Sequence, residues 1–485
     1  MQPIERRLPI KLDSATNGEF VPQPLEAVHR HAIALAQEEA DRNAGRLGMA
    51  RRAFLVSACG AASTLLAMNR ASSAAGRVGG AYELPPESAL DQVAARSALD
   101  KRELVFDVQG HFVNPGGAWT RTLPAGSTPL AGFARNKGYE PKGPGLDYLQ
   151  CLGSEAFIKD VFLDSDTDLM VLSFVPSTRA GEPLTIEEAA ETARIVERMQ
   201  GSHRLLLHGR VNPNQAGDLE FMDVLAERYR VAAWKTYTQW GPDGRGFFLD
   251  DDAGIAFIER AIRLNVRNIA IHKGLPFGQR SYEHSTCVDV GRVARRFPGV
   301  NFLIYHSGFV AEKREGPYDP ARTDGIDSLV TSVREAGIKP GGNVYAELGS
   351  TWRFLMRDPD QAAHALGKLL RHVGEDNVLW GTDSIWYGSP QDQIQAFRTF
   401  QISDAFAERY GYPKLTPAVR AKILGRNALR VYHIAEDVLK VHLAKDATAR
   451  ERENYADRPE PAFLTYGPRT RREFLALRAR SGAGP

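Results

Sequence analysis

The chain has 485 residues, of which 43% are hydrophobic and 25% charged, and its formal net charge is +2 at pH 7. This composition is typical of a soluble globular protein, and the basic residues do not cluster into a nucleic-acid-binding stripe. We expect a small-molecule substrate and no nucleic-acid partner. The three cysteines, Cys59, Cys151 and Cys287, form no C-x-x-C pair, which excludes a disulfide framework or a cysteine-rich zinc site. Any metal ion must therefore be held by histidine and carboxylate side chains.

The segment Met49–Gly76 has the order of features of a twin-arginine export signal. Arg51 and Arg52 are followed by an uncharged run as far as Asn69 and then by small residues. The run is short for a membrane span. We expect recognition by the twin-arginine export machinery, a periplasmic location and no stable membrane span after signal removal. The alternative is a surface helix in a cytoplasmic protein, and translation could start at Met1 or at Met49.

Composition and pattern divide the chain into five parts. These are a polar N-terminal extension (1–48), the signal-like segment (49–76), a linker (77–102), a central domain (103–435) and a charged C-terminal extension (436–485).

In the central domain, short apolar runs alternate with helical patterns. The eight strand-like runs are 103–113, 167–177, 204–213, 231–240, 268–274, 301–309, 343–351 and 377–386. The main helical patterns are 185–200, 218–229, 252–265, 288–297, 359–373 and 416–434. The alternation predicts an α/β fold, a (β/α)₈ TIM-type barrel. A doubly wound sheet is the alternative, but no G-x-G-x-x-G follows any strand.

Two long segments, 114–150 and 310–325, follow the first and sixth predicted strands. Because both begin at strand ends, both could cover the mouth of the barrel as lids, or they could be surface decoration.

Polar side chains end four of the predicted strands. His111, His272, His306 and Asp383 follow strands one, five, six and eight. In a barrel these ends converge on one mouth, where active sites lie. Burying the four groups together without a cation or a shared proton network would be costly, and imidazole with carboxylate suits one divalent metal, zinc or manganese.

The order of the motifs "FDVQGHF", "AIHKG", "IYHSG", "WGTDS" and "ILGRNALRVY" resembles the amidohydrolase-related family of the amidohydrolase 2 type. That group includes aminocarboxymuconate-semialdehyde and resorcylate decarboxylases, and the resemblance covers Glu103–Tyr432. It implies that His111, His272 and Asp383 are metal ligands. It also implies that His306 is the catalytic acid or base.

Gln109 departs from the family pattern, in which histidine or glutamate precedes the second ligand of strand one. An amide oxygen is a weak ligand for a transition metal. The site could keep its metal on three strong ligands with Gln109 or water as a fourth, bind metal loosely, or use Gln109 on the substrate without a metal. We favour the first interpretation.

Aromatic and basic residues near the strand ends are candidate substrate contacts. They are Lys235, Tyr237, Trp240, Trp352, Arg353 and Trp386. Such a mouth suits a flat, anionic substrate, although the rings could equally be packing residues.

The main expected function is metal-dependent hydrolysis of a C–O or C–N bond, with Asp383 taking a proton from metal-activated water and His306 assisting the leaving group. The alternative is non-oxidative decarboxylation of an aromatic or unsaturated carboxylate. A second alternative is a non-catalytic barrel that only binds a ligand. A homodimer is possible in each case.

Overall fold

The protein is described by a computed structural model that covers residues 8–12, 24–123, 127, 129–136, 145–200, 203–276, 282–443, 450–452 and 454. Within these residues, a parallel sheet runs in the order β2 to β9 and confirms the predicted barrel. Its strands are β2 (Phe106–Gly110), β3 (Leu169–Leu172), β4 (Leu205–Arg210), β5 (Ala233–Tyr237), β6 (Asn268–His272), β7 (Asn301–Tyr305), β8 (Val344–Glu347) and β9 (Val378–Leu379). Hydrogen bonds from Val108 N to Trp380 O and from Asp383 N to Gln109 O, both 3.0 Å, join the last strand to the first.

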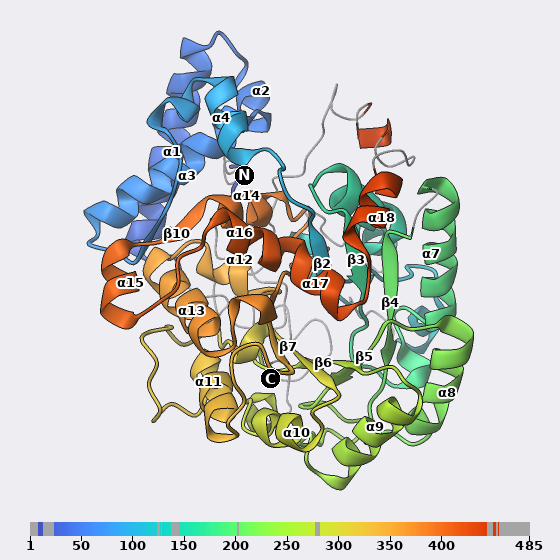
Figure 1. Ribbon diagram of the computed structural model, residues 1–485. Coiled ribbons are helices and arrows are strands. Elements are labelled where there is room, and N and C mark those ends of the chain that lie inside the picture. The colour runs from blue at the N-terminus through green and yellow to red at the C-terminus, as the bar shows by residue number, and fades with distance from the viewer. Residues whose placement is uncertain are drawn as a thin grey trace.

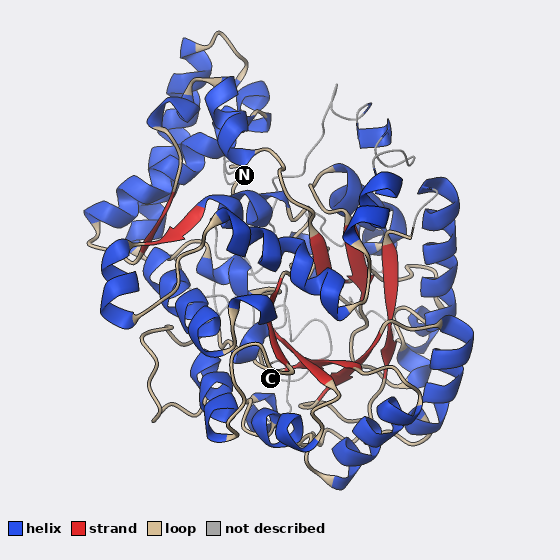
Figure 2. Cartoon of the chain, in the orientation of Figure 1, coloured by secondary structure: helices blue, strands red, loops and turns tan. Residues whose placement is uncertain are grey.

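Helices surround the strands (Figure 2). They are α5 (Ala131–Asn136), α6 (Ser154–Ile158), α7 (Ile186–Gln200), α8 (Asp218–Tyr229), α9 (Asp252–Arg263), α10 (Val290–Arg296), α11 (Gly325–Glu335), α12 (Thr351–Leu355), α13 (Pro359–His372), α14 (Gln391–Thr399), α15 (Asp404–Tyr410), α16 (Pro417–Ala421), α17 (Asn427–Val431) and α18 (Glu436–Leu443). The predicted helical segments all contain helices, and α11 was not predicted.

Strand β5 shows how residue alternation builds the two layers of the core. Ala233 belongs to the hydrophobic cluster inside the barrel, whereas Trp234 belongs to the cluster between strands and helices. Because successive strand side chains point to opposite faces, Lys235 and Tyr237 share the inner face with Ala233. The alternation of side chains along β5 therefore places Lys235 inside the barrel.

The amino-terminal end of the barrel is closed by α17. Ala428 and Leu429 of this helix belong to the inner hydrophobic cluster together with Leu104 and Phe106. The ring of Tyr432, just after α17, lies 5.5 Å from the ring of Phe106. The carboxyl ends of the strands are therefore the end at which a site can form.

The first hundred residues add a lobe of four helices beside the barrel (Figure 1). They are α1 (Ala27–Arg46), α2 (Arg51–Val56), α3 (Ala58–Ala74) and α4 (Gln92–Leu99). The buried face of α1 is a row of alanines at helical spacing, Ala32, Ala36, Ala40 and Ala44. Such small side chains let a second helix approach closely, and Asn43 of α1 donates to Ser63 of α3 at 3.2 Å. The lobe joins the barrel through strand β1 (Gly80–Tyr82), which pairs antiparallel with β10 (Phe400–Ile402).

The signal-like segment Met49–Gly76 forms α2 and α3 in this lobe. Cys59, Ala62 and Leu65 of α3 are completely buried. Export and periplasmic location stay predictions. Among the described residues, no helix is both long and apolar enough to cross a membrane. Most of the predicted C-terminal extension lies outside the described residues.

The 310–325 segment is fixed against the outside of the barrel. Glu315 is buried and accepts hydrogen bonds from Lys368 of α13 and from the Ile326 backbone. Arg314 pairs with Asp358 at 3.2 Å. Through these contacts this segment faces α13 and the N-terminal lobe.

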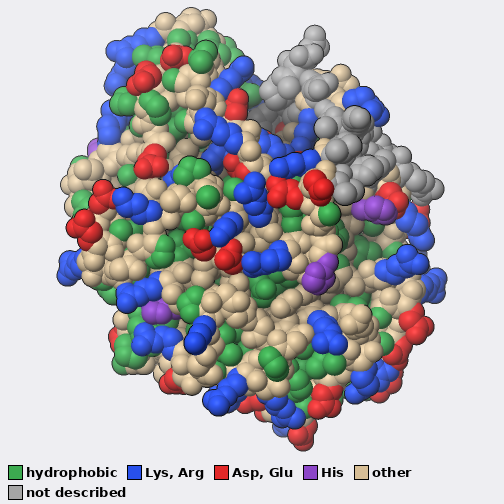
Figure 3. Space-filling view, viewed as in Figure 1, with side chains coloured by type: hydrophobic (Ala, Val, Ile, Leu, Met, Phe, Trp, Pro, Cys, Tyr) green, Lys and Arg blue, Asp and Glu red, His purple; other side chains and the backbone are tan. Residues whose placement is uncertain are grey.

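On the face shown in Figure 3, basic and acidic side chains are interspersed.

Candidate active site

The four predicted site residues at the strand ends are brought together at the carboxyl end of the barrel as two close pairs. His111 Nε2 lies 3.1 Å from Asp383 Oδ1, and His306 Nε2 lies 3.2 Å from His272 Nδ1. All four side chains are buried. Their closeness follows from barrel closure, since they come from four different strand ends.

Asp383 is held by three hydrogen-bond donors. Its Oδ1 accepts from Gln109 Nε2 at 2.9 Å and faces His111 Nε2, and its Oδ2 accepts from Ser350 Oγ at 2.6 Å. Burial alone would raise the pKa of Asp383, but the hydrogen bond and charge of His111 outweigh burial and hold that pKa below its ordinary value. Asp383 is therefore an ionised carboxylate whose oxygens are already engaged.

The histidine pair presents two lone pairs to each other. The Nδ1 of His306 faces the carbonyl of Gly349 at 2.6 Å, and the Nε2 of His272 faces the carbonyl of Leu275 at 3.3 Å. Carbonyl oxygens only accept, so each of these outer nitrogens carries the proton of its ring. Burial lowers the pKa of His306 to about 4 and that of His272 well below its usual value, so both rings are neutral at pH 7. Two facing lone pairs repel each other, so either a shared proton or a bound cation must stabilise the pair.

Gln109 and His111 contact the same carboxylate because residues two apart on an extended chain share a face. The ladder between β2 and β3 also shifts register between Asp107 and Gly110. The amide nitrogen of Gln109 donates to Asp383, while its Oε1 is buried with no hydrogen-bond partner among the described residues. Gln109 thus acts as a donor to a ligand carboxylate.

Two glycines make room for Gln109 and Glu347. A methyl group on Gly349 would lie 2.1 Å from Gln109 Oε1, and one on Gly381 would lie 1.6 Å from Glu347 Oε1. Glu347 is fully buried and accepts from the backbone nitrogens of His306 at 3.0 Å and Gly349 at 2.6 Å. Burial raises its pKa to about 8. A neutral Glu347 therefore anchors the segment that carries His306.

Aromatic rings flank both histidine groups. Trp386 stacks on His111 with centroids 5.3 Å apart, and Tyr237 stacks on His272 at 4.8 Å. Phe133, from the long segment after β2, packs on Trp386 at 4.2 Å. Described parts of this segment form a buried cluster over Trp386 that includes Trp119, Tyr148 and Leu152. They lie over this side of the site, where the first of the two candidate lids was predicted; residues 124–126, 128 and 137–144 lie outside the described residues.

The other predicted substrate contacts lie in different parts of the barrel, and one of them is remote from the site. Lys235 is inside the barrel with its ammonium 3.8 Å above the Tyr305 ring. Arg353 lies 5.7 Å from the Tyr387 ring, and Trp240 is buried in the turn after β5. Trp352 is not brought to the site.

Trp352 belongs to the outer core because the chain turns into α12 directly after β8. Its indole nitrogen donates to Gln393 of α14 at 2.9 Å, and its ring packs on Phe397 and Phe400 at 5.2 and 5.5 Å. It is a packing residue between helices, which corrects its assignment as a substrate contact.

The donor set fits a divalent metal. Imidazole lone pairs and one ionised carboxylate are the ligands that zinc and manganese accept, and a cation would also stabilise the facing nitrogens of His272 and His306. The donors stand as two pairs, however. Among the described residues, the one group of three whose ligand atoms all lie within 4.8 Å is Glu26, His29 and Asp358, outside the barrel mouth.

That second group is a poor cation site because guanidinium groups already neutralise it. Arg77 and Arg314 each pair with both Glu26 and Asp358. Burial, followed by the charges of nearby arginines, lowers the pKa of His29 to about 4. The group is an ion-pair junction between the N-terminal lobe and the barrel.

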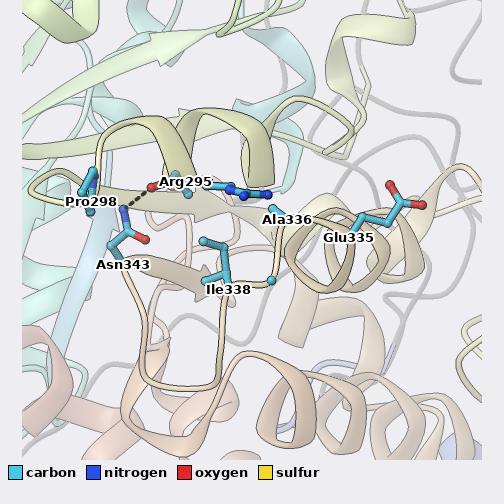
Figure 4. Close-up of a pocket in the computed structure, with 8 residues that line it drawn as sticks. Arg295, Pro298, Glu335, Ala336, Ile338 and Asn343 are labelled. Carbon is cyan, nitrogen blue, oxygen red and sulfur yellow. Dashed lines mark hydrogen bonds between the residues drawn. The ribbon is translucent and has the colours of Figure 1, made fainter.

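A surface pocket of about 440 Å³ lies away from the histidines (Figure 4). It is lined by residues at the ends of α10 and α11, among them Arg295, Pro298, Glu335, Ile338 and Asn343. Asn343 uses its side-chain nitrogen to bind the carbonyls of Ala294, Phe297 and Val300, which is a structural role. Pro298 and Asn343 precede β7 and β8, so this pocket is at the opposite end of the strands from the site.

Ser350 and Tyr387 were missed by sequence reasoning. Ser350 Oγ lies 2.6 Å from Asp383 and 2.9 Å from the Tyr387 hydroxyl, so the two extend the network around the carboxylate. The available signals were small: a serine just after β8 and a tyrosine four residues after Asp383.

Comparison with known proteins gives a family and a set of distant folds. The profile of the amidohydrolase family matches residues 159–434. No curated protein sequence matches the chain.

Among solved structures, 5-carboxyvanillate decarboxylase from Novosphingobium aromaticivorans, with bound manganese, is 13% identical with a TM-score of 0.45 and covers 69% of this chain and 98% of its own. The same enzyme from Sphingomonas paucimobilis is 14% identical, with a TM-score of 0.43 and coverage of 69% and 100%. The 2,6-dihydroxybenzoate decarboxylase from Rhizobium is 14% identical, with a TM-score of 0.40 and coverage of 68% and 99%.

Proposed function

This chain belongs to the amidohydrolase family, and from that premise we propose that it is a metal-dependent decarboxylase of a small, flat carboxylate. The observation that favours decarboxylation over hydrolysis is that both carboxylate oxygens of Asp383 are already hydrogen-bonded. Gln109, His111 and Ser350 already engage its two oxygens, so Asp383 is a poor base for taking a proton from water. Hydrolysis, the main expectation from sequence, needs such a base, whereas decarboxylation needs a cationic site, a proton donor and a dry slot.

His111, His272 and Asp383 would hold the metal once His111 has given up the Nε2 proton that faces Asp383, and His306 would face the same point through Nε2. When bound, a divalent metal supplies positive charge that stabilises a substrate carboxylate and a neighbouring oxygen. Gln109 would support Asp383 through its amide nitrogen and would not be a ligand. A hydrogen bond to a ligand carboxylate fixes that carboxylate in place.

The substrate would lie between aromatic surfaces. Trp386 and Tyr237 present ring faces beside His111 and His272, and a planar acid can stack on such faces. Lys235, on the inner face of β5, adds positive charge below the mouth. The covering cluster around Phe133 would exclude water, which would strengthen the attraction between these cations and an anionic substrate.

In the reaction, the bond between the substrate carbon and its carboxylate breaks and carbon dioxide leaves. The electron pair stays on the substrate carbon, which then takes a proton. The Nε2 of neutral His306 faces the site, so it would take up a proton from solvent when the anionic substrate binds and then deliver that proton to the carbon, while the Nδ1–H stays on the Gly349 carbonyl. Glu347 holds the backbone of His306 in place.

Hydrolysis stays the second candidate because His306 could also act as a base. Neutral His306 carries a lone pair on Nε2, and this lone pair could take a proton from water in place of Asp383. A lactone or amide would then be the substrate.

Product analysis tests the choice. Purified protein loaded with zinc or manganese would be incubated in D₂O with hydroxybenzoates and unsaturated dicarboxylates, and separately with lactones and amides. We expect carbon dioxide and a product with one deuterium at the carbon that lost the carboxylate. We expect His306→Asn to lower turnover by roughly a hundredfold or more, whereas the exposed His203→Asn keeps it. A ring-opened acid without carbon dioxide would establish hydrolysis instead.

A further inference from the structure

Residues 8–12 are buried on the barrel although they lie far outside the family match at 159–434. Leu8, Ile10 and Leu12 belong to the main hydrophobic cluster, and Ile10 is completely buried. Hydrophobic side chains at alternate positions fix the segment, so Lys11 between them has a defined place.

The ammonium group of Lys11 is enclosed by acceptors. Its Nζ donates to the carbonyls of Tyr387 at 2.8 Å and Ser389 at 3.0 Å, and it lies 3.6 Å from Oδ1 of Asp392. The Lys11 backbone nitrogen also donates to Asp392 at 3.2 Å. Burying an ammonium group is costly unless its donors are paired, and Lys11 is only 4% exposed with all three partners present. The contact is therefore a specific one.

The loop that Lys11 holds is the loop that carries the site aromatics. Tyr387 shares its hydroxyl with Ser350 at 2.9 Å, and Ser350 donates to Asp383. Trp386, one residue earlier, stacks on His111. Holding the Tyr387 carbonyl in place therefore also positions the Tyr387 and Trp386 side chains, which contact the surroundings of Asp383 and His111, two predicted metal ligands.

We propose that Lys11 is a positioning residue for the active site and that the first hundred residues remain part of the working enzyme. The effect on turnover rests on the proposed function, whereas the effect on the loop does not. A chain cut at the small-residue end of the signal-like segment, near Ala75, would lack Lys11. The burial of α3 agrees with retention, because a cut near Ala75 would remove α1, α2 and α3, and with them buried side chains of the main hydrophobic cluster such as Phe54 and Leu65.

The test compares Lys11→Met and Lys11→Arg in the full chain, with Lys101→Met as the matched control. Lys101 also pairs with an aspartate, Asp168, but at the start of β3, the other end of the barrel. The first readout is amide hydrogen exchange of residues 384–392, which needs no substrate. We expect exchange to become about tenfold faster in Lys11→Met, to stay near the wild-type rate in Lys11→Arg, and to be unchanged in Lys101→Met.

The second readout is the pair of constants kcat and KM, measured on variants that fold like the wild type. We expect kcat of Lys11→Met to fall by roughly tenfold to a hundredfold with a smaller change in KM, and Lys11→Arg to recover most of it. The third readout is the intact mass of protein from the native host, which should retain residue 11. Unchanged loop exchange in Lys11→Met, or a mature chain that begins after Ala75, would overturn the proposal. Faster loop exchange in a chain without any turnover would count against the proposed function alone.

Discussion

Gln109 and Asp383 are 274 residues apart in sequence and are joined by a 2.9 Å hydrogen bond from the amide nitrogen to Oδ1. In the proposed metal site, the glutamine would therefore support the Asp383 carboxylate and would not itself be a ligand.

Gln109→His is expected to raise metal affinity, because an imidazole lone pair, which suits zinc, would replace an amide donor that does not bind metal. Metal retained after dialysis, measured by elemental analysis, checks this. Gln215→His, on a loop before α8, is the control and should leave metal content unchanged. Lower metal content in Gln109→His would mean that the hydrogen bond to Asp383 matters more than an added ligand.

Gly381→Ala is expected to destabilise the fold by about 1–3 kcal/mol, because the new methyl group would overlap the buried carboxyl of Glu347. Gly45→Ala in α1 is the matched control, since nothing lies within 4 Å of its side-chain position. It should be neutral or stabilise by up to about 1 kcal/mol through helix propensity. Urea denaturation of both variants checks the pair, and equal stability would contradict the packing around Glu347.

Removing the metal is expected to abolish turnover and to lower stability, because the buried side chains of His111, His272 and Asp383 would lose the cation that they are proposed to hold. At a hundredfold excess over Kd, a bound ion contributes about 2.7 kcal/mol. Chelation followed by zinc or manganese should restore both properties. Calcium is the control, since it prefers oxygen ligands. Equal stabilisation by calcium would argue against an imidazole site.

Acid is expected to weaken the junction between the N-terminal lobe and the barrel through His29. Burial, with Arg357 and Arg77, lowers its pKa to about 4, while Glu26 and Asp358 partly oppose this. Between the unfolded pKa of about 6.5 and pH 4 the unfolded chain binds the extra proton, so stability falls as the pH falls through this window. His29→Gln should flatten the dependence when urea denaturation is compared at pH 7 and pH 5. An unchanged slope would assign the acid sensitivity to other groups.

The barrel was predictable because its signals are local. Each strand is a short apolar run, and the polar residue that ends it stays at the mouth in any closed barrel. Trp352 was misassigned for a different reason: a residue after a strand end can face the mouth or the outer core. The turn into α12 decided which, and that turn is set by packing against α14.

The N-terminal lobe was not predictable for a related reason. The apolar stretch of α3 has the composition of a signal core and of a buried helix alike, and only the alanine face of α1 distinguishes them. Lys11 gave no signal at all, since its partners are backbone carbonyls 376 and 378 residues away.

The amino-terminal end of the barrel is closed by α17, which is synthesised after all eight strands. The inner hydrophobic cluster that contains Leu104 and Phe106 is completed by side chains near the end of the described chain. A nascent chain therefore carries an uncovered apolar cavity until Leu429 has left the ribosome. Apolar surface that stays exposed in an incomplete chain favours its aggregation.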